Sequence, residues 1–474
     1  MRRCLERAAI LASLAALAAI PPTVRAQDRL LQDWTMFHGD ARHSGWTGAD
    51  APHDSLLAWT RFTGDSIFYS SPVVASDGTI YIGTAGEELL ALDPDGEVRW
   101  RYRTLGNLKY ATPAIGPDGR IYVGDAAGMF YAINPDSTKA WTFQAGGAIK
   151  SSATIGPGGE IYFGCDDGLL YALDHDSSLR WTYPAGDTIR SSPAVAPDST
   201  VLFGCYDSYL YALRPDGTLR WRALTGGPIK YASPAVDTAN VVYCGSYDGF
   251  LYAVTTSQEF LWACPLENAI RSTPAIGPEG RTFVCAGTRL FCLKPDGDIE
   301  WHRDTGGVIY SSPLYYSEDQ AIVVGSDDGR LHCVHEDGTG DWTFTVGEPI
   351  RTSPAPSADS RLIYAADLTG VLRAFGSPVD LGVDEGGGAR HVRCVASPNP
   401  AFARVTFTIL GDVTRQTKIR IHDLSGRRIS ELIPDGSGIA QWNGRDAAGR
   451  SLPAGVYYCR LLDGGAALPL ILLD

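Results

Sequence analysis

The sequence predicts an all-β protein: an eight-bladed β-propeller of four-stranded blades, followed by a small β-sandwich. The first observation is a tryptophan that recurs every 39 to 41 residues over eight copies. The second is a small residue, alanine or cysteine, that recurs in the same copies. Two positions that recur with the same spacing over eight copies of about 40 residues are typical of propeller blades. The tryptophans are Trp59, Trp100, Trp141, Trp181, Trp221, Trp262, Trp301 and Trp342, and the small residues are Ala91, Ala132, Ala172, Ala212, Ala253, Cys292, Cys333 and Ala374.

Each repeat unit reads as a four-stranded antiparallel meander. The stretch from Ser191 to Lys230 contains four short apolar runs separated by turn residues. Runs such as Leu170–Leu173 are apolar at consecutive positions, which indicates a sheet buried on both faces between neighbouring blades. Asp-Gly pairs such as Asp95-Gly96 suit tight hairpins, because glycine accepts a positive φ.

The unit resembles the PQQ-type propeller repeat, most fully between Ser151 and Trp181, where the text YFGCDDGLLYALD precedes LRW. The resemblance covers about residues 56–376. It implies the fold of the quinoprotein dehydrogenases and of the BamB-type outer-membrane assembly lipoproteins. It does not by itself imply the function of either, since one fold hosts many functions.

The N-terminal region predicts export. Residues 1–26 combine Arg2, Arg3 and Arg7 with an apolar run and a small-residue end, as in a secretory signal peptide. Cys4 precedes the apolar run, so the lipoprotein-type cysteine of the assembly lipoproteins has no counterpart after it. No later segment is long and apolar enough for a transmembrane helix.

Residues 27–55 are expected to form an arm on the propeller. Trp34, Phe37 and Trp46 should pack against the blades. His38 and His43 could be metal ligands or structural residues, and no further ligand of suitable spacing lies near them in the sequence. The structural interpretation is therefore favoured.

The two ends of the propeller region, residues 56–376, are incomplete in complementary ways. The segment Leu56-Leu57-Ala58-Trp59 is a fourth strand without its first three. The last copy, from Ser353 to Phe375, has three strands and no tryptophan. The N-terminal strand should therefore close the eighth blade.

Residues 377–390 are rich in glycine and predict a linker. Residues 391–474 contain strand-like runs, among them RVTFTIL and GVYYCRLL. The blocks Asp423–Arg427, Asn443–Asp446 and Gly455–Tyr457 resemble the FlgD-like immunoglobulin-type domain and the C-terminal sorting domains of type IX secretion. This resemblance implies contact with a secretion machinery. Cys394 and Cys459 could pair across this sandwich or remain separate.

Composition excludes several function classes. The formal net charge of −14 disfavours general nucleic-acid binding, which depends on Lys and Arg neutralising phosphates. Cys292 and Cys333 stand where other blades have alanine, so they read as small core residues.

No catalytic or metal-binding arrangement emerges from the sequence. A Gly-x-Ser-x-Gly elbow, a His-Glu-x-x-His helix and a phosphate loop are absent. In the run His332-Cys333-Val334-His335, Cys333 and His335 would share one face of a strand while His332 points to the other, so the three side chains would not converge. An adjacent-cysteine pair and long blade insertions, which quinoproteins use to hold their quinone, are also absent. We therefore expect no metal and no cofactor.

One polar feature recurs: a cation stands just before the first strand in six blades, and Tyr69 and Tyr310 stand there in the other two. First strands line a propeller's axis, so these side chains should ring one mouth of the channel. Two interpretations remain open: the cations pair with nearby aspartates, or they bind an anionic protein or carbohydrate ligand. The cations are Lys109, Lys150, Arg190, Lys230, Arg271 and Arg351, and the aspartates are Asp125, Asp166, Asp167, Asp207, Asp248 and Asp328.

The sequence as a whole favours a secreted or surface-displayed binding or scaffold propeller without catalytic activity. An envelope assembly scaffold of the BamB type is the first alternative. A quinoprotein dehydrogenase is the second, and the missing quinone-site features disfavour it.

Overall fold

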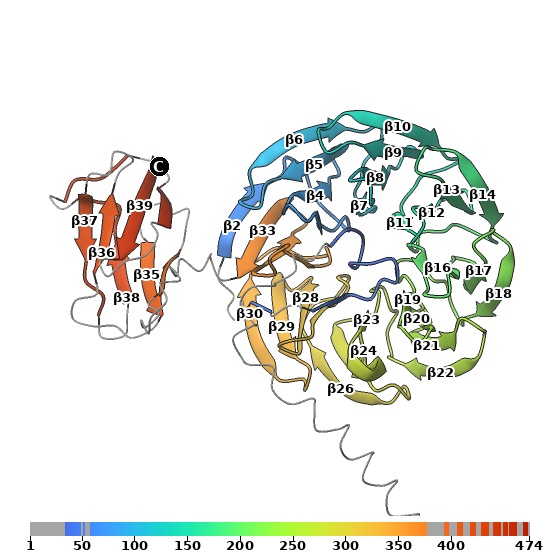
Figure 1. Ribbon diagram of the computed structural model, residues 1–474. Coiled ribbons are helices and arrows are strands. Elements are labelled where there is room, and N and C mark those ends of the chain that lie inside the picture. Colours follow the sequence, from blue (N-terminus) through green and yellow to red (C-terminus); the bar gives the residue numbers. More distant parts are fainter. Residues whose placement is uncertain are drawn as a thin grey trace, which may run out of the picture.

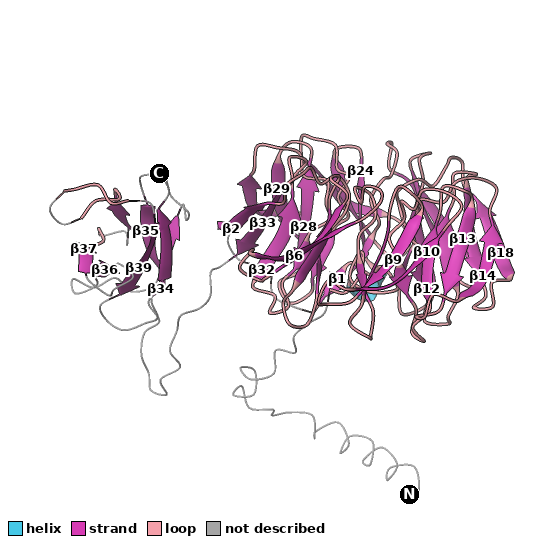
Figure 2. Cartoon of the chain, turned by 90° about the horizontal axis from the view of Figure 1, so that it is seen from above, coloured by secondary structure: helices cyan, strands magenta, loops and turns pink. Residues whose placement is uncertain are grey.

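The computed structural model describes residues 34–48, 51–52 and 57–376, and in the C-terminal region residues 393–397, 405–410, 418–422, 428–435, 439–446, 449–453, 455–461 and 468–472. The expected signal sequence (1–26) and linker (377–390) lie outside the described residues. Residues 57–376 form eight antiparallel sheets arranged radially around an axis (Figures 1 and 2). The expected eight-bladed propeller is confirmed.

Each blade contains four consecutive strands in a meander, except blade 8, whose fourth strand comes from the N-terminal part of the chain. Blade 1 contains β3 (Val73–Val74), β4 (Ile80–Gly83), β5 (Glu88–Leu92) and β6 (Val98–Arg103). Blade 2 contains β7 (Ala114–Ile115), β8 (Ile121–Gly124), β9 (Met129–Ile133) and β10 (Lys139–Gln144). Blade 3 contains β11 (Thr154–Ile155), β12 (Ile161–Gly164), β13 (Leu169–Leu173) and β14 (Leu179–Pro184). Blade 4 contains β15 (Ala194–Val195), β16 (Val201–Gly204), β17 (Tyr209–Leu213) and β18 (Leu219–Leu224).

The second half of the ring repeats this plan. Blade 5 contains β19 (Ala235–Val236), β20 (Val241–Gly245), β21 (Phe250–Thr255) and β22 (Phe260–Pro265). Blade 6 contains β23 (Ala275–Ile276), a 3₁₀ turn at Pro278–Gly280, β24 (Thr282–Ala286), β25 (Arg289–Leu293) and β26 (Ile299–Asp304). Blade 7 contains β27 (Leu314–Tyr316), β28 (Ala321–Ser326), β29 (Arg330–His335) and β30 (Gly340–Thr345). Blade 8 contains β31 (Ala355–Pro356), β32 (Leu362–Ala366) and β33 (Val371–Gly376).

The recurring small residue lets two aromatic rings meet within a blade. In blade 1, Ala91 on the third strand is the cross-strand neighbour of both Tyr81 and Trp100. Because alanine adds so little volume there, the rings of Tyr81 and Trp100 approach to 5.8 Å between centroids. Such offset aromatic pairs add about 0.5–1.5 kcal/mol beyond the area they bury.

The recurring tryptophan joins each blade to the next one. In all eight copies the indole N–H donates a hydrogen bond, 2.7 to 2.9 Å long, to a backbone carbonyl. In seven copies the acceptor follows the tryptophan by 33 to 35 residues, and for Trp342 it precedes it by 290. The acceptors for Trp59 through Trp301, in chain order, are Pro94, Pro135, His175, Pro215, Thr256, Pro295 and Glu336, and Trp342 donates to Pro52. We call these bonds the tryptophan latches.

A second ring of hydrogen bonds surrounds the channel. The inner segment of each blade carries one serine or threonine whose backbone N–H donates to the side-chain hydroxyl of the equivalent residue in the next blade, at 2.9 to 3.0 Å. The ring closes on itself, because Ser353 donates to Ser71. Its members, which we call the hydroxyl belt, are Ser71, Thr112, Ser152, Ser192, Ser233, Thr273, Ser312 and Ser353.

The eighth blade is closed by the N-terminal strand, as the sequence predicts. β2 (Leu57–Phe62) pairs antiparallel with β33, so that Trp59 faces Ala374 across the ladder. The latch from Trp342 to Pro52 lies just before this strand. The ring therefore depends on contacts between residues about 290 positions apart in the sequence.

The arm, residues 34–48, crosses one end of the channel (Figure 1). Its backbone exchanges hydrogen bonds with the inner strands of six blades, from Val74 in blade 1 to Tyr315 in blade 7, and β1 (Trp46–Thr47) pairs with β27. Trp34 is 3% exposed, as expected, whereas Trp46 is 41% exposed and does not pack as predicted.

The two arm histidines are structural. His38 and His43 are both buried, and their Nδ1 atoms lie 2.8 Å from the His43 carbonyl and 3.1 Å from the Pro234 carbonyl respectively. Burial lowers the pKa of His43 to about 4, so its ring is neutral near pH 7. No cluster of three metal-ligand side chains occurs in the part of the chain that the structure describes.

The C-terminal region contains two antiparallel sheets. One is formed by β34 (Arg393–Ser397), β35 (Val405–Leu410) and β38 (Ile439–Trp442), and the other by β37 (Arg428–Leu432), β36 (Ile419–His422), β39 (Gly455–Leu461) and β40 (Leu468–Leu472). Cys394 and Cys459 lie in different sheets, so both alternatives, pairing and separation, stay open. The side chain of Cys394 lies outside the described residues. No helix among the described residues has the length and apolar character to cross a membrane.

Removal of residues 27–62 should abolish cooperative unfolding of the propeller, because it removes the arm and exposes the edge of β33. Differential scanning calorimetry checks this. A truncation after residue 376 is the control, since it removes no propeller strand. A single sharp transition near the wild-type temperature for the first truncation would disprove the closure.

Trp221→Phe should lower the free energy of unfolding by about 1–3 kcal/mol, because it leaves the buried Thr256 carbonyl without its donor. Trp46→Phe, at an exposed tryptophan without a latch, should change it by less than about 0.5 kcal/mol. Urea unfolding of both variants gives the comparison, and equal losses would refute the role of the latch.

Candidate ligand site at the channel mouth

The channel holds a small cavity of about 50 Å³. Each blade contributes the residue two positions before its hydroxyl-belt member, and Phe37 of the arm lies on the same cavity. Because the belt fixes the start of every inner strand, these eight side chains are held in a ring. They are Tyr69, Tyr110, Lys150, Arg190, Tyr231, Arg271, Tyr310 and Arg351.

Three of the ring tyrosines stack on one another. Tyr69 of blade 1 lies 5.4 Å from Tyr110 and 5.6 Å from Tyr231 of the opposite blade, between ring centroids. Burial raises the pKa of Tyr69 to about 12, with the Arg351 charge opposing this shift. The hydroxyl of Tyr69 is therefore neutral near pH 7 and can donate a hydrogen bond.

Three of the ring cations are paired with carboxylates. Asp166 accepts from Lys150 Nζ at 2.6 Å and from Arg190 Nε at 2.8 Å. Arg351 forms two hydrogen bonds with Asp327, each 2.9 Å long. Burial opposes ionisation of Asp166, yet the hydrogen bonds from Arg190 and Lys150 outweigh it, so the pKa of Asp166 is lowered.

Arg271 is the exception. Within residues 57–376 no carboxylate lies within ion-pair distance of its guanidinium, which instead lies over the rings of Tyr247 (5.0 Å) and Tyr310 (5.4 Å). The ring thus holds four cations against two carboxylates, an excess of two positive charges in a chain of net charge −14. Its donors suit a small anion, such as a carboxylate or a sulfate.

The structure brings four of the six predicted cations to the cavity and places two beside it. Lys109 lies over Phe68, 4.7 Å from the ring centroid, and Lys230 lies 4.7 Å from that of Tyr247. Blades 1, 2 and 5 have one more residue than the others between the buried aliphatic residue and the belt hydroxyl. Tyr110 and Tyr231 consequently occupy the ring positions in blades 2 and 5. In the sequence, both tyrosines can be found by counting two positions back from the hydroxyl-belt residue of each blade.

The predicted carboxylate partners need correction as well. Only Asp166, of the six aspartates, pairs with ring cations, and Asp327 was missed. Asp328 contacts His332 Nε2 at 3.0 Å. The other four accept a hydrogen bond, 2.6 to 2.8 Å long, from a tyrosine of their own blade: Asp125 from Tyr131, Asp167 from Tyr171, Asp207 from Tyr211 and Asp248 from Tyr252.

The cavity does not fit a quinone cofactor. Its volume of about 50 Å³ is too small for a ring system of three fused rings, and the stacked tyrosines and Phe37 form part of its lining. The calcium that accompanies such quinones needs a cluster of oxygen ligands, and the described residues contain no such cluster.

Asp166→Asn should lower the free energy of unfolding at pH 7 by about 1–3 kcal/mol, because Lys150 and Arg190 lose their shared charged acceptor. The folded-state pKa of Asp166 is lowered, so the wild-type advantage is complete above the ordinary aspartate pKa of 3.8 and is lost as the pH falls through the folded value. Urea unfolding at pH 7 and pH 3 measures the difference in the free energy of unfolding between the wild type and the variant. A difference between the two proteins that does not shrink at pH 3 would contradict this assignment.

Comparison with known proteins agrees with this fold. A search of curated proteins finds no match to the sequence. Among solved structures, BamB from Moraxella catarrhalis has 16% identity and a TM-score of 0.58, over 68% of this chain and 98% of that one. A europium-containing methanol dehydrogenase has 12% identity and a TM-score of 0.63, over 74% and 99%. The quinohemoprotein alcohol dehydrogenase from Comamonas testosteroni has 14% identity and a TM-score of 0.63, over 78% and 85%.

At these identities the likeness concerns the fold alone. The model of one protein family, described as "Beta-alanine-activating enzyme, beta-propeller", matches residues 111–377. This match covers more than half of the 474 residues. The chain therefore belongs to that β-propeller family.

Proposed function

We propose that this protein is a non-catalytic binding propeller that holds an anionic group of a protein or carbohydrate partner at its channel mouth. The observation that carries the proposal is Arg271, a half-buried guanidinium with no carboxylate partner among the described residues. A partly buried cation without a counter-charge is costly, and a bound anion would remove that cost.

The composition of the ring supports binding over catalysis. The side chains on the cavity are cations, tyrosines, serines and one phenylalanine. General acid–base catalysis needs a group whose pKa lies near the working pH, whereas the pKa values of Arg190 and Arg351 are raised by their carboxylate partners, and that of Tyr69 is raised by burial. The family description names an enzyme that activates β-alanine, and this chain matches the propeller named with it.

Export to the cell surface is the second part of the proposal. It is supported by the signal-like pattern of residues 1–26 and by the resemblance of residues 391–474 to FlgD-like and type IX sorting domains. The two antiparallel sheets of the C-terminal region are compatible with such a domain. An envelope assembly scaffold of the BamB type remains the alternative, and both alternatives share a role in binding.

Arg271→Gln should abolish most of the stabilisation that sulfate or glucuronate gives to the wild-type protein, because a ligand that binds only the folded state raises its stability. Lys109→Gln is the matched control, since it removes one positive charge outside the cavity lining. Thermal unfolding with increasing anion at constant ionic strength is the measurement. The same response in both variants would count against an anion site at the mouth.

A further inference from the structure

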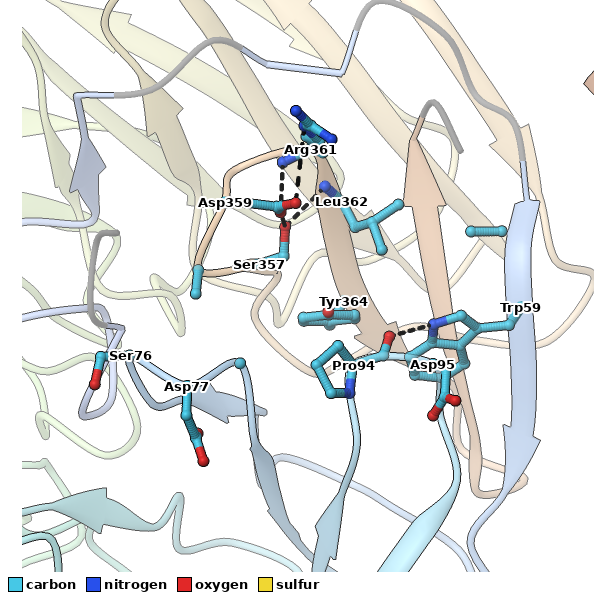
Figure 3. A pocket seen from close by; sticks show the side chains of 13 residues that line it. Trp59, Ser76, Asp77, Pro94, Asp95, Ser357, Asp359, Arg361, Leu362 and Tyr364 are labelled. Atoms are coloured by element: carbon cyan, nitrogen blue, oxygen red, sulfur yellow. Dashed lines mark hydrogen bonds and ion pairs between the residues drawn. The ribbon is translucent and has the colours of Figure 1, made fainter. Parts of the chain in front are cut away.

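A second, larger cavity of about 560 Å³ lies between blades 8 and 1 (Figure 3). Small-molecule sites typically measure about 300–1,000 Å³. Ala58 and Trp59 of β2 and Tyr364 of β32 line it on the side of blade 8, and Pro94 lines it on the side of blade 1. Asp359 lies in the loop between β31 and β32, on the same cavity. This cavity is separate from the channel mouth, because none of its lining residues belongs to the ring.

The cavity lies beside a position, Ala58, at which three other blades have an arginine. In blades 1, 3 and 4 the residue before the latch tryptophan is an arginine. Each of these arginines reaches a carboxylate in the loop between the first two strands of its own blade. The pairs are Arg99–Asp77 at 3.3 Å, Arg180–Glu160 at 3.2 Å and Arg220–Asp198 at 2.7 Å.

Blade 8 keeps the carboxylate, Asp359, but has Ala58 in place of the arginine. Blade 2 also has an alanine at this position, Ala140. There a loop arginine, Arg120, fills the space and donates to the His175 carbonyl of the next blade at 3.2 Å. The loop arginine of blade 8, Arg361, is exposed and lies 3.8 Å from Asp359. Arg361 therefore pairs with Asp359 from the exposed side, and the space beside Ala58, where blades 1, 3 and 4 carry an arginine side chain, is left open.

The walls of the cavity suit a cation carried on an apolar body. The rings of Trp59 and Tyr364 lie 5.6 Å apart between centroids, and Pro94 and Leu362 add aliphatic surface. Aromatic faces attract cations. Of the three aspartates that line the cavity, Asp77 pairs with Arg99 and Asp359 pairs with Arg361, and Asp95 adds one further negative charge. The Tyr364 hydroxyl has no hydrogen-bond partner in the described part of the chain and is available to a ligand.

We propose that this cavity binds a guanidinium group carried on a short apolar body, with the guanidinium in the place of the arginine that blade 8 lacks. The guanidinium pairs with Asp359, which it shares with Arg361, and the apolar body lies against Trp59 and Leu362. The group can come from a free small molecule or from an arginine side chain of a peptide. The inference does not depend on the proposed function of the channel mouth.

Isothermal titration calorimetry of the full chain with three compounds tests the proposal. Benzylguanidinium represents a free small molecule, N-acetylarginine N-methylamide represents an arginine side chain, and benzylurea is the neutral isostere of the first. We expect at least one guanidinium compound to bind at least about tenfold more tightly than benzylurea, and the tighter of the two identifies the source. Failure of both to bind, or equal affinity for benzylurea, would overturn the proposal.

Two variants locate the site. Ala58→Arg supplies the side chain that Arg99 and Arg220 provide in their blades, so it should weaken guanidinium binding at least about tenfold while the protein melts at or above the wild-type temperature. Asp359→Asn should weaken it to a similar extent, whereas Asp136→Asn, in an exposed turn of blade 2, should leave it unchanged. Wild-type affinity in Asp359→Asn and in folded Ala58→Arg would place the binding elsewhere and refute the site.

Discussion

The hydroxyl belt is the interaction on which the rest of the propeller depends. Eight backbone N–H groups donate to eight hydroxyls, and the last bond, from Ser353 to Ser71, joins the two ends of the ring. Each bond alone contributes only about 0.5–1.5 kcal/mol, but together they set the radius of the channel and the start of every inner strand. The residue two positions before each belt member therefore faces the channel, so a structural motif creates the candidate site.

At the outer rim the tryptophan latch joins neighbouring blades. The latch requires a tryptophan in each repeat, whereas the belt requires a serine or threonine. A blade of about forty residues buries both faces of its sheet, so neighbouring blades must approach closely along their whole depth. Gly204 shows how closely: a Cβ on this residue would overlap Ile229 of the next blade. The belt, the close approach and the latch recur in each repeat, because every blade packs both faces of its sheet against two neighbours. Departures from the repeat, such as Ala58 and the tyrosine Tyr247 that lies under Arg271 in place of a carboxylate, then indicate positions where packing is not the reason for the residue.

The fold was predictable because its signals are local and repeated, whereas the sites depend on single departures. Period, strand number and the closure by β2 follow from tryptophan spacing and from two incomplete copies. The extra residue in blades 1, 2 and 5 displaces Lys109 and Lys230 from the ring, and it could be found only by aligning on the belt serine. The partner of Arg351 is Asp327 and not Asp328, because in the turn after β28 Asp327 contacts Arg351 whereas Asp328 contacts His332 of its own blade. The orientation of Arg361, on which the second cavity depends, has no signal in the sequence, because it is set by packing in three dimensions.

Hydrogen exchange of the native protein tests most directly whether the belt couples all eight blades. Ser71→Ala removes the acceptor that closes the ring, and Ser178→Ala, in an exposed turn, is the control. The account predicts that Ser71→Ala lowers the opening free energy by about 1–3 kcal/mol in peptides from the inner strands of every blade. A loss of protection confined to blades 8 and 1, with the other six blades unchanged, would contradict it.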